Sequence, residues 1–205
     1  VTTKLLYNTI RKIKFEKQSN MQYWEKKFNV REDSLKPYLP LINCKYITGM
    51  AKNIHIEIVY RALKTRSLQS NYLEIDENCK TCAENGVKIR EDIMHVIIDC
   101  PKAYNLWTRI NLKLTDTNKI LGIHGSSNDL LYNIIIQTVQ RTLVISRWRY
   151  EKKDKKDDVW KKFKRNILFQ FIRILKCIGE SKIREVFGNN EFIEVYKNNI
   201  MLKIS

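Results

Sequence analysis

Three cysteines and one histidine lie in a short stretch of the sequence, at spacings typical of a metal site. They form the pattern Cys79-x2-Cys82-x12-His95-x4-Cys100. Two cysteines separated by two residues can bind one ion from a tight turn, and the second pair can complete the tetrahedron from a helix and its end. Thiolates together with an imidazole favour zinc among cellular metals. The pattern predicts that these four residues bind one Zn²⁺.

Two other interpretations of these residues stay open. The cysteines could pack in the core or form a disulfide, although five cysteines are an odd number and the charge of the chain favours a reducing compartment. A thioredoxin-like redox site needs a strand and helix unit that the surrounding sequence does not predict. Four protein ligands leave no position for water, so we expect a structural zinc on which the folding of residues 76–101 depends.

The chain carries a large excess of positive charge. It has 38 Lys and Arg against 22 Asp and Glu, which gives a formal net charge of +16 over 205 residues. A basic surface attracts polyanions and releases their counterions, so RNA or DNA is the expected partner. The alternative is a solvated surface in a Lys-rich chain, because Lys outnumbers Arg and Arg is the better phosphate ligand.

Basic residues close to the cysteines are the candidates for this contact. Lys80, Lys88, Arg90 and Lys102 would surround a metal-ordered loop that presents them to phosphates. A solvated rim around the loop is the alternative. A denser basic run, partly neutralised by aspartates, is either a solvated face or a surface that tracks phosphates, and it contains Lys152, Lys153, Lys155, Lys156, Lys161, Lys162, Lys164 and Arg165.

The apolar pattern predicts a mostly α fold, a multi-helix domain with a small CCHC zinc-binding loop or hairpin. Apolar residues recur at spacings of three and four, and six Gly and three Pro supply few helix breakers. The expected helices cover 1–30, 51–66, 91–98, 101–110, 129–150 and 160–175. We expect a loop or short hairpin over 67–90 and one or two short helices over 180–205.

The chain divides into three expected segments. Residues 1–49 form a helical segment with a loop at Pro37 and Pro40, residues 50–150 the zinc-binding region, and residues 151–205 a basic helical segment. No stretch reaches the roughly 18 apolar residues of a membrane span, and the N-terminus lacks a secretory pattern. We therefore expect a soluble intracellular protein, in the nucleus or the cytoplasm, without a membrane partner.

Other residues with chemical potential have no partner in the sequence. His55 and His124 are expected to be ordinary surface or core histidines, and Cys44 and Cys177 buried small apolar groups. The tryptophans lie at helical spacing, so we expect core anchors, with base stacking as the alternative; they are Trp24, Trp107, Trp148 and Trp160.

The segment around the cysteines resembles the zinc-binding region that follows the polymerase domain of non-LTR retrotransposon reverse transcriptases. Residues 79–107, CKTCAENGVKIREDIMHVIIDCPKAYNLW, share its C-x2-C turn, an acidic residue before the histidine, apolar residues after it, then Cys-Pro and Leu-Trp. These later positions are Asp92, His95, Val96, Ile97, Cys100, Pro101, Leu106 and Trp107. The flanks EIVYRALKTRSLQSNYLEI and ILGIHGSSNDLLYNIIIQTVQRTLVISRW are also similar, so the resemblance covers roughly residues 50–150.

The resemblance implies the C-terminal part of an element-encoded protein that binds its own RNA and target DNA during target-primed reverse transcription. The polymerase portion of that longer chain would be a further partner, and Val1 in place of Met also suggests a fragment. Asp157-Asp158 lies among lysines rather than between apolar strands, so the polymerase palm is absent. Some of these elements carry a PD-(D/E)xK nuclease after the zinc-binding region, but that motif needs a proline and no Pro follows Pro101. No ribonuclease H pattern is visible either. We expect neither polymerase nor nuclease activity from this chain.

Two hypotheses follow. The first is a zinc-dependent module that binds and positions nucleic acid without much base reading. The second is a scaffold in which zinc staples helices together and the protein contacts the polymerase portion. An independent enzyme is disfavoured, because the sequence offers no nucleophile with a base, no carboxylate cluster and no phosphate loop.

Overall fold

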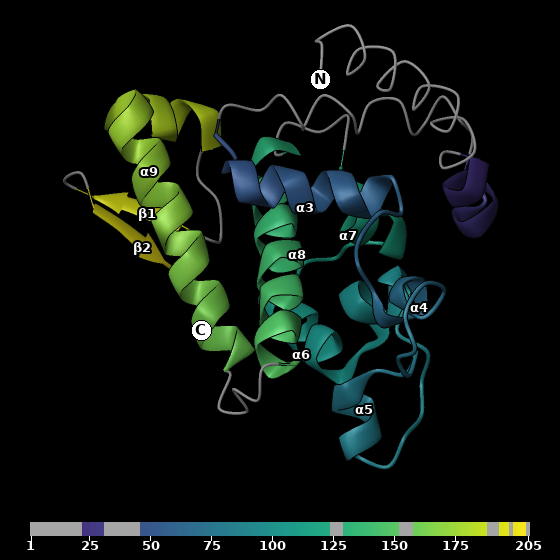
Figure 1. Cartoon of the computed structure of the whole chain (residues 1–205). Helices are drawn as coiled ribbons and strands as arrows, with labels where there is room; N and C mark the ends of the chain where they lie inside the picture. Colours follow the sequence, from purple (N-terminus) through teal and green to yellow (C-terminus); the bar gives the residue numbers. More distant parts are fainter. Residues whose placement is uncertain are drawn as a thin grey trace, which may run out of the picture.

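The computed structural model describes residues 22–30, 46–123, 129–151, 158–187, 193–196 and 199–203. It is mostly helical, as the sequence predicts, and its helices lie around the long helix α8 (Asp129–Glu151) (Figure 1). The loop at Pro37 and Pro40, together with Cys44, His124 and the run 152–157, lies outside these residues. The remaining elements are α3 (Gly49–Val59), α4 (Arg66–Gln69), α5 (Lys80–Glu84), the π-helix η2 (His95–Asp99), α6 (Pro101–Ile110), α7 (Asp116–Leu121), α9 (Val159–Phe187), β1 (Ile193–Tyr196) and β2 (Asn199–Leu202).

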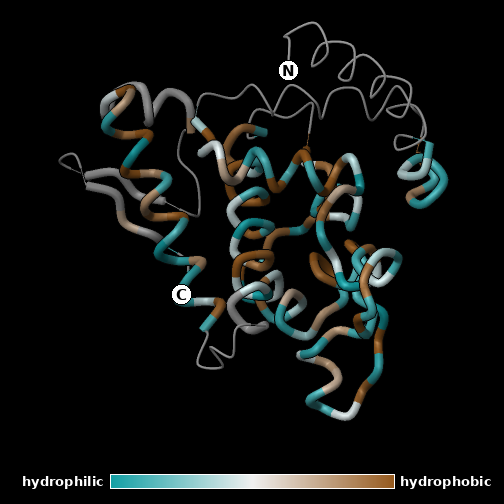
Figure 2. The backbone as a smooth tube through the Cα atoms, viewed as in Figure 1, coloured by the Kyte–Doolittle hydropathy of each residue, from teal (hydrophilic) through white to brown (hydrophobic). Residues whose placement is uncertain are grey.

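Helix α8 occupies the middle of the molecule and is buried on most sides, as predicted. It packs against α3 and α9, and Figure 2 shows hydrophobic residues along its length. Its neighbours cover polar as well as apolar side chains, and the buried polar residues are Asn133, Gln137, Thr138, Gln140, Thr142 and Ser146. Its buried apolar residues are Leu131, Ile134, Ile135, Ile136, Val139, Leu143 and Val144.

Two apolar clusters meet along α8. The first joins α6, α8 and α9 and contains the three cysteines of the predicted metal site. The second joins α3, η2 and α7, together with Trp24 from the helical residues 22–28. Leu143 belongs to the first cluster and its neighbour Val144 to the second. The predicted metal site therefore lies where the two halves of the core come together.

Helix α3 is shorter than the predicted helix over 51–66. Its N-cap is Thr48, whose side chain accepts a hydrogen bond from the Ala51 N–H. The helix ends at Val59, and Arg61 adopts a left-handed conformation with φ 57° that an α-helix cannot continue through. Leu63, predicted to be buried in the helix, reaches the core from the following turn.

The C-terminal prediction of one or two short helices over 180–205 is confirmed as far as Phe187 and is wrong for the strands β1 and β2. Helix α9 continues to Phe187 across a break at Gly179 (φ 80°), and β1 and β2 form an antiparallel hairpin with Ile193 opposite Leu202. The hairpin contacts α9. Its strands are rich in β-branched and aromatic residues, which favour extended backbone over helix. Cys177 is exposed on α9, so its predicted burial is also wrong.

None of the helices among the described residues combines the length and apolar character that a membrane crossing requires.

Candidate metal centre

Cys79 and Cys82 are positioned by a tight turn at the start of α5. Cys79 is the residue before the helix and Cys82 lies inside it. The chain returns through Gly86, whose φ of 79° suits glycine, and the Cys79 N–H donates to the Ile89 carbonyl at 2.8 Å. One antiparallel bridge, Asn78 to Arg90, closes the turn. The predicted loop or hairpin over 67–90 thus also contains two short helices, α4 and α5.

His95 and Cys100 are positioned by a π turn. The Cys100 N–H donates to the His95 carbonyl at 2.8 Å, a bond between residues five apart. The Asp92 carboxylate accepts from the His95 N–H at 2.8 Å and fixes the start of this turn. Pro101 then begins α6, as predicted. The x4 spacing between histidine and cysteine therefore spans one π turn rather than the expected α-helical turn.

Helix α6 is held against the π turn by a tryptophan. The Trp107 indole Nε1–H donates to the Ile97 carbonyl at 2.8 Å, and both residues are buried. This bond fixes the direction in which α6 leaves Cys100. Trp107 and Trp24 are core residues, as expected, whereas Trp148 and Trp160 keep part of their surface exposed.

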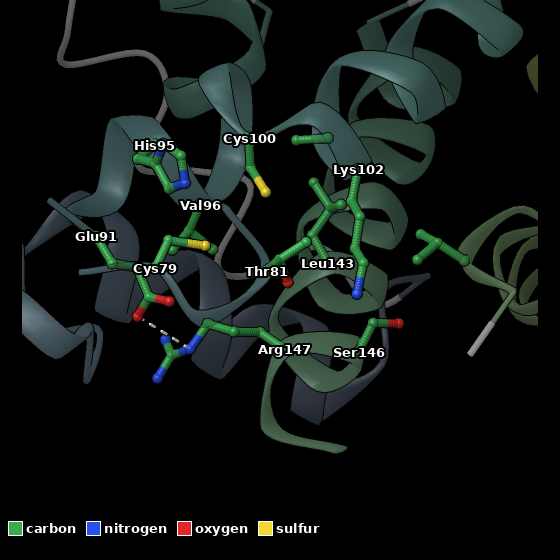
Figure 3. Close-up of a pocket in the computed structure, with 12 residues that line it drawn as sticks. Cys79, Thr81, Glu91, His95, Val96, Cys100, Lys102, Leu143, Ser146 and Arg147 are labelled. Carbon is green, nitrogen blue, oxygen red and sulfur yellow. Dashed lines mark ion pairs between the residues drawn. The ribbon is translucent and has the colours of Figure 1, made fainter. Parts of the chain in front are cut away.

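The structure brings the four predicted ligands together. The ligand atoms of Cys79, Cys82, His95 and Cys100 all lie within 4.8 Å of one another, and all four residues are buried. Cys82 Sγ and His95 Nε2 are 3.5 Å apart. Tetrahedral zinc, with Zn–S about 2.3 Å and Zn–N about 2.0 Å, places sulfur and nitrogen about 3.5 Å apart. The cysteines are free thiols, so this group could hold one metal ion. Figure 3 shows three of its members, Cys79, His95 and Cys100.

Negative charge in the cluster concentrates on Cys79. A hydrogen bond from Cys100 lowers the pKa of Cys79 to about 3, against the effect of burial. That same bond and burial raise the pKa of Cys100, and burial raises the pKa of Cys82. Burial lowers the pKa of His95, but the hydrogen bond and charge of Cys79, with nearby carboxylates, outweigh it and the net shift is upward. A divalent cation would displace the remaining thiol protons.

The unbound nitrogen of the histidine is the least satisfied atom of the site. With Nε2 directed at Cys82, His95 Nδ1 is buried and makes no hydrogen bond to any described residue. Metal-bound imidazoles usually donate this second N–H to a carboxylate or carbonyl. Here the nearby carboxylates of Glu91 and Asp99 act on the ring through their charges, in addition to the charge of Cys79.

A buried carboxylate connects the metal centre to α8. Glu91 Oε1 accepts the Arg66 N–H at 2.9 Å and lies 3.3 Å from Arg147 Nε (Figure 3). Arg147 also donates to the Lys64 carbonyl at 2.6 Å. The sequence analysis missed this pair, because a glutamate in a polar run and an arginine on a distant helix carry no local signal of their contact.

The four basic residues predicted to contact nucleic acid lie on different sides of the metal centre. Lys80 and Lys88 are exposed on α5 and on the returning strand. Arg90 pairs with Glu77 at 3.0 Å and lines a pocket with Tyr23 and other residues. Lys102 is partly buried and lines two other hollows.

One of these hollows lies directly beside the metal ligands. Lys102 lines it together with Cys79, Cys100 and Ser146, and its side chain extends toward the Ser146 hydroxyl (Figure 3). Ser146 belongs to α8 and is buried, and sequence reasoning did not single it out. Of the four basic residues predicted to contact nucleic acid, Lys102 is the one that lines this hollow together with the cysteines.

Comparison with models of protein families, with curated proteins and with solved structures finds no match to this chain.

Proposed function

We propose that Cys79, Cys82, His95 and Cys100 hold one structural Zn²⁺, and that the chain is a zinc-ordered module that binds and positions RNA or DNA. The observation that carries the proposal is the buried set of ligand atoms within 4.8 Å of one another. Three thiolates and an imidazole form a donor set that zinc prefers, and it leaves no position for a reacting water. The metal in this proposal is structural.

Zinc would act by joining parts of the chain that have little core of their own. The segment from Lys80 to Arg90 is mostly exposed, and its main buried side chain is Cys82. The metal would tie this segment to the π turn and to the start of α6. Binding free energy at such a site becomes folding free energy, because the unfolded chain offers no preformed site.

Nucleic-acid binding is supported by charge. A formal net charge of +16 on a folded chain favours contact with phosphates and the release of counterions. The sequence resemblance to the region after the polymerase of non-LTR retrotransposon reverse transcriptases points in the same direction. Under this proposal the chain contributes binding and positioning, and the chemistry belongs to the polymerase portion of a longer protein.

Binding measured before and after metal removal tests the proposal. Native mass spectrometry gives the zinc content, and fluorescence anisotropy with labelled RNA and DNA gives the affinity over a range of salt. We expect one zinc per chain, an affinity that falls steeply with salt, and loss of tight binding in the Cys79→Ser variant. Equal binding by loaded and stripped protein would contradict the zinc part, and salt-insensitive binding the nucleic-acid part.

A scaffold function is the second candidate, favoured by an apolar patch on α9. Phe169 is 62% exposed and Ile172, almost one turn further on, is 37% exposed. Such side chains suit protein contact better than phosphate contact. Pull-down of a separately expressed polymerase portion by the wild type, but not by Phe169→Asp, would support this candidate, and absence of complex would contradict it.

A further inference from the structure

An open groove runs between α6 and the first turn of α9. Lys102, Asn105 and Arg109 line it from α6, and Val159 and Trp160 line it from α9. Lys102 and Val159 also line the hollow beside the metal ligands. The groove, called here the α6–α9 groove, therefore lies next to the hollow beside the metal ligands and follows α6 from Lys102 to Arg109.

Trp160 provides an aromatic surface in this groove. Its ring stacks on fully buried Phe163, with 5.6 Å between centroids and 22° between planes, so the indole is held in place. Trp160 itself stays partly exposed. Arg109 Cζ lies 5.8 Å and Lys164 Nζ 5.3 Å from the centroid of its ring. Both cations lie over the ring, so a base that stacks on Trp160 would replace them there and leave them to bind its phosphate.

The charge of the groove favours a polyanion. Lys102 and Arg109 lie on α6, and Lys161 and Lys164 follow on the first turns of α9. Asp158 also lines the groove, but its carboxylate accepts the Lys161 N–H at 3.1 Å and caps α9. The basic side chains outnumber this single acidic one.

The aromatic ring distinguishes a single strand from a duplex. In a duplex the faces of the bases are stacked on one another, and a protein ring inside a groove cannot reach them. In a single strand the bases can turn out and stack on aromatic side chains while the backbone follows a basic surface.

We propose that the α6–α9 groove binds single-stranded nucleic acid, with Lys102 and Arg109 on successive phosphates and a base stacked on Trp160. The inference rests on the proposed nucleic-acid function and deepens it, because it names the strand form and the binding surface. It also moves the expected contact from the exposed tip of the metal loop to the face that joins α6 and α9.

Anisotropy with three labelled probes tests the proposal: an oligo(dT) and an oligo(U) of about 15 nucleotides, within the usual site sizes of single-strand binders, and a duplex of equal length. We expect the zinc-loaded protein to bind the single strands more tightly than the duplex. Trp160→Leu should weaken single-strand binding about 5- to 150-fold, the range for loss of one stacked base. Arg109→Gln should lower the slope of log affinity against log salt by about 0.7.

Matched variants on α9, away from the groove, control for charge and for aromatic content. Arg173→Gln removes an exposed arginine of α9 about 20 Å from the groove, and Phe169→Leu removes an exposed aromatic ring. We expect both to bind the single strands within about twofold of the wild type.

A second measurement covers the case in which Trp160→Leu does not fold. Stacking of a base on Trp160 should quench tryptophan fluorescence in the wild type, and Trp160→Phe, which keeps a ring on Phe163, should bind with much less quenching.

The outcomes separate this inference from the function on which it rests. Failure of the wild type to bind any of the three probes would overturn the nucleic-acid function and the groove with it. Tight binding that is unchanged by Trp160→Leu and Arg109→Gln, or equal affinity for the duplex, would overturn the groove alone. A difference between the oligo(dT) and oligo(U) affinities would identify which single strand the groove prefers.

Discussion

Glu91 Oε1 lies 3.3 Å from Arg147 Nε, and the two side chains are only 2% and 11% exposed. Glu91 is in the segment between the cysteine turn and the π turn, and Arg147 belongs to the central helix α8. The pair therefore connects the metal centre to the core independently of the metal. Because both groups are mostly removed from water, their charges are weakly screened and the attraction between them is stronger than at the surface.

Loss of Arg147 should destabilise the protein strongly. Arg147→Leu removes the cation that lies 3.3 Å from the buried Glu91 carboxylate, so we expect the free energy of unfolding to fall by about 3–5 kcal/mol. Urea denaturation of the zinc-loaded protein measures this change. In the double variant Glu91→Gln with Arg147→Leu, the buried carboxylate charge is removed together with its cation, and the loss should be smaller. A double variant no more stable than Arg147→Leu would contradict this explanation.

The start of the π turn depends on one carboxylate. Asp92→Ala removes the acceptor of the His95 N–H and should lower zinc affinity about 5-fold, the effect of about 1 kcal/mol lost at a helix start. Competition with a chromogenic chelator measures the affinity. Asp116→Ala, at the start of α7 and paired with Lys119 on the surface, is the matched control and should leave zinc affinity unchanged.

His55 should make stability depend on pH. Burial lowers its pKa below the ordinary value of 6.5, and Nδ1 lies 3.0 Å from Gln140 Oε1. Gln140 Nε2 donates to the Lys119 and Ile120 carbonyls, so its oxygen accepts from the His55 Nδ1–H. The folded state thus favours neutral His55. This stability is fully present above about pH 6.5 and is lost as pH falls below it, by at most about 1.4 kcal/mol per pH unit.

Comparison with His55→Gln isolates this effect from acid release of the metal, which both proteins share. We expect the free energy of unfolding of the wild type, relative to the variant, to decrease between pH 7 and pH 5.5 in urea denaturation. A constant difference across that range would show that His55 does not titrate on unfolding.

Cysteine variants should distinguish the thiols that bind the metal from a thiol that does not. Cys82→Ser removes one ligand and should abolish retention of zinc and lower the thermal midpoint, because the metal contributes to folding. Cys177→Ser changes an exposed thiol on α9 and should behave as the wild type in metal content and melting. Equal zinc content in both variants would argue against the proposed ligand set.

The sequence alone predicts the features that come from a repeating apolar pattern or from the spacing of metal-binding residues. Helices α8 and α9 carry long apolar patterns, and the structure confirms that both bury them. The metal ligands were found because two cysteines at x2 spacing and a nearby His–Cys pair have few other uses. Both signals are local in the chain, which is why they can be read without a structure.

The sequence alone does not predict contacts between residues that are far apart in the chain, or the choice between two local structures of similar free energy. The contact between Glu91 and Arg147 arises only when α8 packs beside the cysteine turn. The segment that forms β1 and β2 is short, and its apolar spacing and its β-propensity favour different structures. The hairpin packs against α9, and a sequence pattern does not show such a contact. Cys177 lies three residues after buried Ile174, which is why burial was predicted. At this end of α9 the core contacts are made by Leu175 and Ile178 instead, and the Cys177 thiol is exposed.

The most direct test of the central claim is zinc K-edge X-ray absorption of the purified protein. The account predicts one tightly bound zinc with three sulfur neighbours at about 2.3 Å and one nitrogen at about 2.0 Å. The shell should lose one sulfur or lose the metal altogether in Cys100→Ser. A first shell dominated by oxygen, or a folded protein that retains no zinc, would contradict it.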